Sequence, residues 1–305
     1  MNSFIMSVLQ QSLIFSITVM GIYITYKILK FADLSADGSF TLGASVSAIL
    51  ITRGVSPIVS LGISMLAGAL AGLATGILNV KLKIQDILSS ILVMVGLYSI
   101  NLRIMEGKAN LPLFNHKSLF TDKNPLFVLS IITLICAMFF TLFFKTKLGY
   151  LLKGIGDNEN MITSLGINIG SIKIFALSLS NSFIALSGGI MAQYQGFSDI
   201  NMGTGTMIMG LASIIIGYSI FKRIGFLNSS IICIVGTLLY RTSIALSLRA
   251  GFNPSDLKLI SSILVVIVLS IGNSKELFIN RRNQSLRKKK LKNSTTLREA
   301  GGGNA

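Results

Sequence analysis

Apolar and polar positions fall in long blocks along this chain rather than in a short period. Nine apolar windows are separated by short polar segments, at residues 4–28, 34–52, 56–79, 84–104, 126–144, 173–195, 206–221, 225–247 and 257–272. A helix needs about 20 apolar residues to cross a bilayer core of about 30 Å. Such runs favour helices over barrel strands, because a spanning segment must satisfy its backbone hydrogen bonds internally. The pattern predicts an all-α, polytopic transmembrane helical bundle without a soluble domain.

The number of spans follows from the length of each window. We expect about nine, with about eight or ten as alternatives, because the windows 34–52, 206–221 and 257–272 are short or polar. Within the third window, Gly68, Gly72 and Gly76 recur at every fourth position. This spacing predicts close contact between helices of one subunit, in preference to a dimer seam.

Composition supports a membrane protein and excludes several other classes. Hydrophobic residues make up 51% of the chain and charged residues only 12%, against about 25% in soluble domains. The two cysteines, Cys136 and Cys233, lie inside apolar windows, and His116 is the only histidine. A disulfide framework and a metal site are therefore not expected.

Positive charge is concentrated in the polar segments and at the end of the chain. The net charge is +16, and eight basic residues lie beyond residue 280. Next to a last membrane helix, such a run marks the cytoplasmic side more often than a nucleic-acid site. We expect a membrane domain over 1–275 and a disordered, basic cytoplasmic tail over 276–305. Lysine-rich and lysine-poor segments alternate, which predicts a multi-pass protein of the plasma membrane with its N-terminus outside and its C-terminus cytoplasmic.

A polar island, Leu148–Lys173, interrupts the apolar pattern and falls on the predicted cytoplasmic side. Its residues predict a short helix over 158–165, with Gly156 ending the approach, Asp157 as N-cap and Gly166 as a left-handed stop. By spacing alone, an ordinary connecting loop is the simpler interpretation. A capped helix at this place is also what a transporter needs to receive force from a motor subunit.

The residue pattern of the island favours the second interpretation. It has small, basic and acidic positions at fixed spacing: Leu148, Gly149, Leu152, Lys153, Gly154, Gly156, Asp157, Asn158, Leu165, Gly166, Ile167 and Asn168. This segment resembles the coupling loop of permeases of the branched-chain amino acid and ribose type ABC importers. Gly210–Leu239 and, more weakly, Phe31–Ala44 resemble two further segments of that family, so that the resemblance covers about residues 1–275.

The resemblance implies a permease subunit of a binding-protein-dependent importer, which passes a small solute across the plasma membrane. It implies a homodimer in membrane lipid, two copies of an ATP-binding subunit that hydrolyses the ATP, and an extracytoplasmic solute-binding protein, expected to be a lipoprotein. Gly149 and Gly166 would form turns. The residues expected to contact the ATPase are Lys153, Gly156, Asp157, Asn158, Glu159, Met161 and Leu165.

The chain has no energy-converting motif of its own. Its sole Gly-Lys pair, Gly107-Lys108, lacks the upstream glycine and the following Ser or Thr of a phosphate-binding loop. We therefore expect a transporter subunit and not an enzyme, without catalytic residues, cofactor or nucleic-acid partner. The energy would come from a partner ATPase or, if the chain were an ion-coupled secondary transporter, from an ion gradient. A scaffold that holds anionic lipid or RNA through its tail is a third alternative.

Polar residues inside apolar windows are candidates for the pathway, because they are costly in a membrane. Asp33 and Asp37 open the second window. The candidates are Asp37, Ser39, Asn101, Asn181, Gln193 and Arg241. We expect the serines around Asn181 to bond their own helix, and Arg241 to extend toward the outer surface or the outer vestibule. The favoured solute is an amino acid, aromatic or branched-chain, with a nucleoside, purine or sugar as the alternative.

Overall fold

The computed structural model describes residues 2–114, 116–121, 123–221 and 229–251, together with the single residues Leu259, Ser262, Ile263 and Val266. The predicted span 257–272 and the tail 276–305 lie outside these described residues, apart from those single positions.

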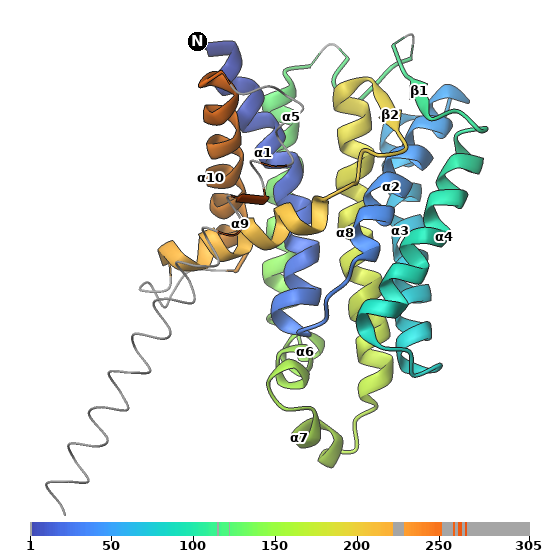
Figure 1. Cartoon of the computed structure of the whole chain (residues 1–305), viewed down its shortest axis with the longest axis vertical. Coiled ribbons are helices and arrows are strands. Elements are labelled where there is room, and N and C mark those ends of the chain that lie inside the picture. Colours follow the sequence, from blue (N-terminus) through green and yellow to red (C-terminus); the bar gives the residue numbers. More distant parts are fainter. Residues whose placement is uncertain are drawn as a thin grey trace, which may run out of the picture.

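Six helical segments in the described part are long and apolar enough to cross a membrane. The first, Phe4–Ile28, joins α1 (Asn2–Ile22) to the π-helical turn η1 (Tyr23–Ile28). The others are α3 (Pro57–Val80), α4 (Asp86–Ile104), α5 (Pro125–Phe143), α8 (Ile169–Gln195) and α10 (Ser229–Arg249). They run side by side along the long axis of the molecule (Figure 1). The predicted all-α polytopic bundle is confirmed.

Two of the predicted windows form helices that are not among these six apolar segments. The helix α2 (Ser35–Thr52) follows a non-helical stretch over 29–34, and its polar residues keep it outside the six apolar segments. The helix α9 (Thr206–Phe221) lies across the axes of α1 and α10 (Figure 1). Its 16 residues span only about 24 Å, which is short for a bilayer core. The total number of spans therefore stays a prediction.

The helix α8 is the centre of the bundle and packs against α1, α2 and α3. Glycines allow the backbones to approach. A Cβ at Gly72 would lie 2.2 Å from the carbonyl oxygen of Leu177, and one at Gly43 only 1.8 Å from that of Ala185. Gly68 and Gly76 likewise face α8 closely. The prediction that these α3 glycines serve packing within the subunit is confirmed.

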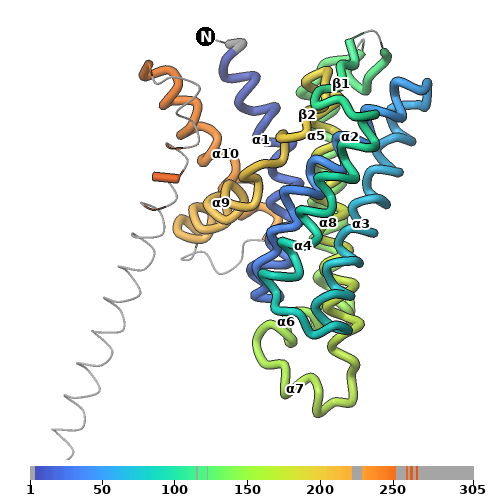
Figure 2. Tube along the Cα trace, turned by 45° about the vertical axis from the view of Figure 1, so that its right-hand side comes forward, coloured from blue at the N-terminus to red at the C-terminus, as the bar shows by residue number. Residues whose placement is uncertain are grey.

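The two ends of the bundle differ in construction. At one end lie the start of α1, the end of α10 and an antiparallel pair of strands, β1 (Asn110–Pro112) and β2 (Phe197–Asp199), in which Leu111 lies opposite Ser198. The opposite end carries two short helices, α6 (Lys147–Asp157) and α7 (Glu159–Ser164), as Figure 2 also shows. The polar island thus projects from the end that lies away from the N-terminus.

Candidate functional site

The helix α6 is capped by Thr146, whose hydroxyl accepts a hydrogen bond from the amide of Gly149. The predictions that Gly149 forms a turn and that Gly156 ends the approach are wrong, because both lie inside α6. They are glycines for a different reason. A Cβ at Gly156 would lie 1.7 Å from the carbonyl oxygen of Ile28, and one at Gly149 would lie 2.4 Å from that of Phe143. The helix α6 is therefore pressed directly against the end of η1.

The helix α7 is capped by Asn158, which accepts a hydrogen bond from the amide of Met161 at 3.2 Å. The predicted N-cap, Asp157, is instead the last residue of α6. Asn158 has an extended backbone, with φ −156° and ψ 99°, and this conformation separates the two helices. Gly166 has φ +75°, so the predicted left-handed stop is confirmed.

The outer surface of α7 combines acidic, amide and apolar side chains. Met161 and Leu165 are each 62% exposed, although both are large and hydrophobic. The exposed polar residues at this end include Lys153, Asp157, Asn158 and Glu159. Beneath them, Ile162 is buried against Gly154, and Glu159 forms an ion pair of 2.6 Å with Lys173 of α8. We call residues 147–165, which span α6 and α7, the tip of the bundle. The tip is partly apolar at its surface and is tied to α8 by an ion pair.

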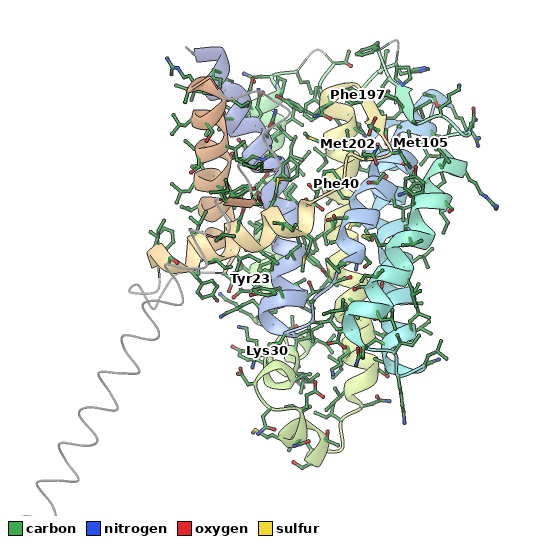
Figure 3. The ribbon with its side chains drawn as sticks, viewed as in Figure 1. Tyr23, Lys30, Phe40, Met105, Phe197 and Met202 are labelled. Carbon is green, nitrogen blue, oxygen red and sulfur yellow. The ribbon has the colours of Figure 1, made fainter. Side chains whose placement is uncertain are left out.

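The end of η1 connects this tip to α9. The Tyr23 and Tyr218 hydroxyls lie 2.8 Å apart, and the ammonium of Lys27 lies 4.5 Å from the centre of the Tyr218 ring. After η1, the chain turns at Lys30, which has φ +56° and lies beside α6 in Figure 3. A displacement of α6 would therefore act on η1 and on the non-helical stretch that follows.

Asp33 lies near the end of this stretch and is completely buried. Its carboxylate accepts hydrogen bonds from the Ser35 amide at 3.0 Å, from the Ser35 hydroxyl, and from the Asn181 amide nitrogen at 2.8 Å. The Thr75 hydroxyl donates to Ser35 at 3.2 Å. No salt bridge to Asp33 is found among the described residues. The structure thus places the candidate Asn181 against an acid that was not among the candidates, although the cost of a carboxylate at the edge of an apolar window could have included it.

Asp37 holds the N-terminus of α9. It accepts hydrogen bonds from the amides of Gly205 at 2.7 Å and Met207 at 2.9 Å, and from the Thr206 hydroxyl at 2.9 Å. Gly203 is needed in the preceding turn, because its Cβ would lie 2.0 Å from the Asp37 carbonyl oxygen. A carboxylate at a helix N-terminus is electrostatically favourable. This contact fixes α9 to α2.

Asn101 lies next to Asp37 and is only 1% exposed. Its amide nitrogen donates to the carbonyl oxygen of Gly38 at 3.2 Å, while its Oδ1 has no hydrogen-bond partner among the described residues. Ser39 is fully buried, and in the same part of the chain its hydroxyl also has none.

The other two candidates lie elsewhere and make structural contacts. Gln193 donates to the Ser47 hydroxyl at 3.0 Å and accepts from the Leu119 amide at 3.2 Å. Arg241 donates to Gln11 at 3.3 Å, and its guanidinium lies 3.7 Å from the centre of the Phe15 ring. Arg241 therefore packs on α1, and its extension toward the outer surface or the outer vestibule stays a prediction.

The serines around Asn181 also correct a prediction. Ser178 donates to the carbonyl oxygen of Ala69 and Ser180 to that of Gly21, each at 2.8 Å, so both bond to a different helix. Only Ser182 bonds its own helix among these three. Where these helices cross closely, the small serine side chains let the backbones approach, and the hydroxyls of Ser178 and Ser180 add hydrogen bonds between helices.

A cavity of about 410 Å³ lies beside Asp37, lined by residues of α2, α4 and the segment that precedes α9. It is lined by Asp37, Gly38, Thr41, Met94, Val95, Tyr98, Ser99, Asn101, Ile200, Asn201 and Thr204. A second cavity, of about 480 Å³, lies between α2, α3 and α4 and has an almost entirely apolar lining. Of the six pathway candidates, only Asp37 and Asn101 meet in a cavity described here.

Comparison with known proteins shows the family to which the chain belongs. Residues 4–270 match the family described as "Branched-chain amino acid transport system / permease component". The chain is 53% identical over 270 residues to the tyrosine transport system permease protein of Clostridioides difficile, covering 88% of this chain and 91% of that protein. It is 24% identical to the ribose import permease protein of Escherichia coli, covering 69% and 68%. It is 27% identical to a probable branched-chain amino acid transport permease protein of Methanocaldococcus jannaschii, covering 61% and 63%.

No solved structure matches the chain. The family match covers most of its length, includes the polar island and extends over every helix named above. The chain is a multi-pass membrane protein and belongs to the family of permease components of branched-chain amino acid transport systems.

Proposed function

We propose that this chain is the permease subunit of a binding-protein-dependent ABC importer that passes an aromatic amino acid across the plasma membrane. The observation that carries the solute class is the 53% identity, over almost the whole chain, to a permease named for tyrosine. A sugar is the alternative solute, because more distant relatives are named for ribose and galactofuranose.

The subunit would work with partners on both sides of the membrane. Two ATP-binding subunits would dock at the α6–α7 end, a solute-binding lipoprotein would dock at the strand-bearing end, and two copies of the chain would form the pathway. The orientation would place the N-terminus outside and the C-terminus in the cytoplasm. The absence of a phosphate-binding loop in the sequence supports a separate ATPase.

The exposed tip suggests how the ATPase would engage. Met161 and Leu165 give α7 an apolar surface of the kind that anchors a protein interface, and acidic and amide groups surround it. Glu159 is held by Lys173, so α7 is tied to the base of α8. Force on α7 would therefore reach α8 through the ion pair between Glu159 and Lys173.

The packing of α6 supports a route into the bundle. Because Gly156 brings α6 into direct contact with the end of η1, a shift of α6 would displace Ile28 and the stretch 29–34. That stretch leads to Asp33, which is held by α8, and to Asp37, which holds α9. We infer that movement at the tip is passed to α2 and α9 through these two acids.

The docking of the ATPase is tested by co-purification from native membranes with the tagged full-length chain. We expect an ATP-binding subunit to be recovered, and to be lost when Met161→Asp and Leu165→Asp are combined. Phe114→Asp is the matched control, because Phe114 is 78% exposed but lies in the opposite part of the bundle, next to Gly196. Loss in the control, or retention in the α7 variant, would contradict the docking assignment.

The solute is tested by uptake into proteoliposomes that hold the assembled importer and its binding protein. We expect ATP-dependent uptake of L-tyrosine that excess ribose does not reduce. ATP-dependent uptake of ribose without uptake of tyrosine would refute the aromatic amino acid and favour the sugar.

A further inference from the structure

The cavity beside Asp37 combines features that the importer function alone does not require. It is formed by the first turns of α2, one face of α4 and the segment over 200–204, which lie together in Figures 1 and 2. Its volume of about 410 Å³ falls in the range of small-molecule sites, about 300–1,000 Å³. Its lining contains both hydrogen-bonding and apolar side chains.

The lining of the cavity offers hydrogen-bond acceptors and contains no cationic side chain. Asp37 is the only ionisable carboxylate in the lining, and no Lys, Arg or His is among the lining residues. Three donors, all from the start of α9, reach its two oxygens, whereas a carboxylate offers about four lone-pair sites. The carboxylate therefore has room for one further donor.

Asn101 adds a second acceptor whose direction is determined by its neighbour. The carbonyl oxygen of Gly38 can only accept, so the amide nitrogen of Asn101 must face it, and Oδ1 is left on the other side. That oxygen is buried and has no partner in the described part of the chain. Buried acceptors of this kind are rare in native proteins and call for an explanation such as a ligand. Because Asn101 is hydrogen-bonded to Gly38, which directly follows Asp37, the two acceptors line the same cavity from neighbouring helices.

The remaining lining matches the rest of an aromatic amino acid. Met94 and Tyr98 lie four residues apart on α4 and therefore share one helix face, on which an aromatic ring can stack. Tyr98 is 51% exposed and lines the cavity. Ser99, Asn201 and Thr204 are exposed lining residues whose hydroxyl and amide groups can donate to a carboxylate.

We propose that this cavity is a solute subsite within the permease, at which Asp37 and Asn101 accept hydrogen bonds from the ammonium group of an aromatic amino acid. The proposal rests on the proposed function and names the part of the permease that would contact its solute. An ammonium group brings three donors and a positive charge, which suit two acceptors and a carboxylate with no cationic side chain in the lining. A sugar would bring donors without the charge.

Protection from alkylation tests the subsite in the assembled importer. In a background with Cys136→Ala and Cys233→Ala, Ser99→Cys places one thiol in the lining. Ile100→Cys is the matched control, because Ile100 lines the apolar cavity instead. We expect L-tyrosine to slow the reaction of the Ser99→Cys variant with N-ethylmaleimide at least threefold, and to leave the control unchanged.

Analogues then separate the groups that are recognised. Tyramine, which keeps the ammonium group, should protect the Ser99→Cys variant, whereas 4-hydroxyphenylpropionate and ribose should not. Adding Asn101→Leu, which keeps the size of the side chain but removes the acceptor, should reduce protection by tyrosine at least threefold. If that variant fails to assemble, the comparison of analogues in the unaltered cavity still decides the outcome.

Equal protection by tyramine and 4-hydroxyphenylpropionate, or none by tyrosine, would overturn the subsite. These results are distinguishable from failure of the proposed function. If ATP-dependent uptake of tyrosine persists while the cavity is not protected, the importer assignment stands and only the subsite is refuted. If uptake itself is absent, the proposed function fails first.

Discussion

The buried pair formed by Asp33 and Asn181 offers a direct measure of what fixes the non-helical stretch before α2 to α8. We consider Asp33→Leu, Asn181→Leu and the variant that carries both changes. Asp33→Leu leaves the Ser35 and Asn181 donors without their acceptor. An unmade buried hydrogen bond costs about 1–3 kcal/mol per group, so we expect this change to lower the free energy of unfolding by about 2–5 kcal/mol.

The second single change should cost a similar amount for the opposite reason. Asn181→Leu removes one donor from a carboxylate that is fully buried, and a hydrogen bond to a charged group contributes about 1.5–3 kcal/mol. In the double variant both partners of this bond are absent, so its loss is counted once. We therefore expect the two changes to be non-additive by about 1–3 kcal/mol.

The chain contains a matched control for this comparison. Asn79 donates to Asp86 at 2.7 Å, against 2.8 Å for Asn181 and Asp33, but the first pair is exposed and the second is buried. The same substitutions at Asn79 and Asp86 should show a coupling below about 0.5 kcal/mol, because water competes for the exposed pair. The difference between the two cycles isolates the effect of burial.

The assay is reversible unfolding of the purified chain in mixed detergent micelles, followed by circular dichroism of the helices. Each single and double variant is compared with the unaltered protein under one set of micelle conditions. A coupling at Asp33 and Asn181 no larger than that of the control pair would refute the reasoning. It would mean that the buried hydrogen bond between Asn181 and Asp33 contributes no more to stability than an exposed one.

Three further predictions concern α6, α7 and η1, through which movement at the tip would reach the rest of the bundle. Gly156→Ala should lower solute uptake per ATP hydrolysed by at least tenfold in proteoliposomes, because its Cβ would collide with the end of η1, whereas Gly62→Ala, with open space around it, should have no effect. Asn158→Ala should weaken binding of the ATP-binding subunit in a pull-down, because loss of an N-cap costs about 1 kcal/mol, and Asp157→Ala should weaken it less. Equal effects of these two changes would contradict the capping assignment. Tyr23→Phe removes two hydroxyl contacts and should destabilise the protein by about 1–2 kcal/mol in the unfolding assay, and an unchanged stability would exclude a structural role for these contacts.

Errors of the sequence-based predictions occur where two local choices were almost equally good. Asp157 and Asn158 are both strong N-cap residues, and their sequence neighbours do not distinguish them. The choice depends on where α6 ends, and α6 continues through Gly156 because that residue packs against η1. The cap is therefore decided by a contact with a segment more than 120 residues earlier in the chain.

The candidate polar residues show the same limit. Their cost in a membrane made them visible, but their partners are distant in sequence: Asn181 meets Asp33, Gln193 meets Ser47, and Arg241 meets Gln11. Periodicity says which face of a helix is polar, but it does not say which helix lies opposite. Asp37 and Asn101 are brought to one cavity only because α2 and α4 are adjacent.

By itself, the sequence determined the class of the protein, the approximate bounds of most long helices and the family, because hydrophobic length, glycine spacing and the motif of the polar island are local properties. The close packing of Gly68 and Gly72 belongs to the same group, since small residues at this spacing bring backbones together wherever they pack. Only the tertiary structure decided the orientation of α9, the non-helical stretch over 29–34 that precedes α2, and the grouping of polar side chains. The physical reason is that a buried polar group takes its partner from whichever segment the packing brings within about 3 Å, and that segment is not specified by its neighbours in the chain.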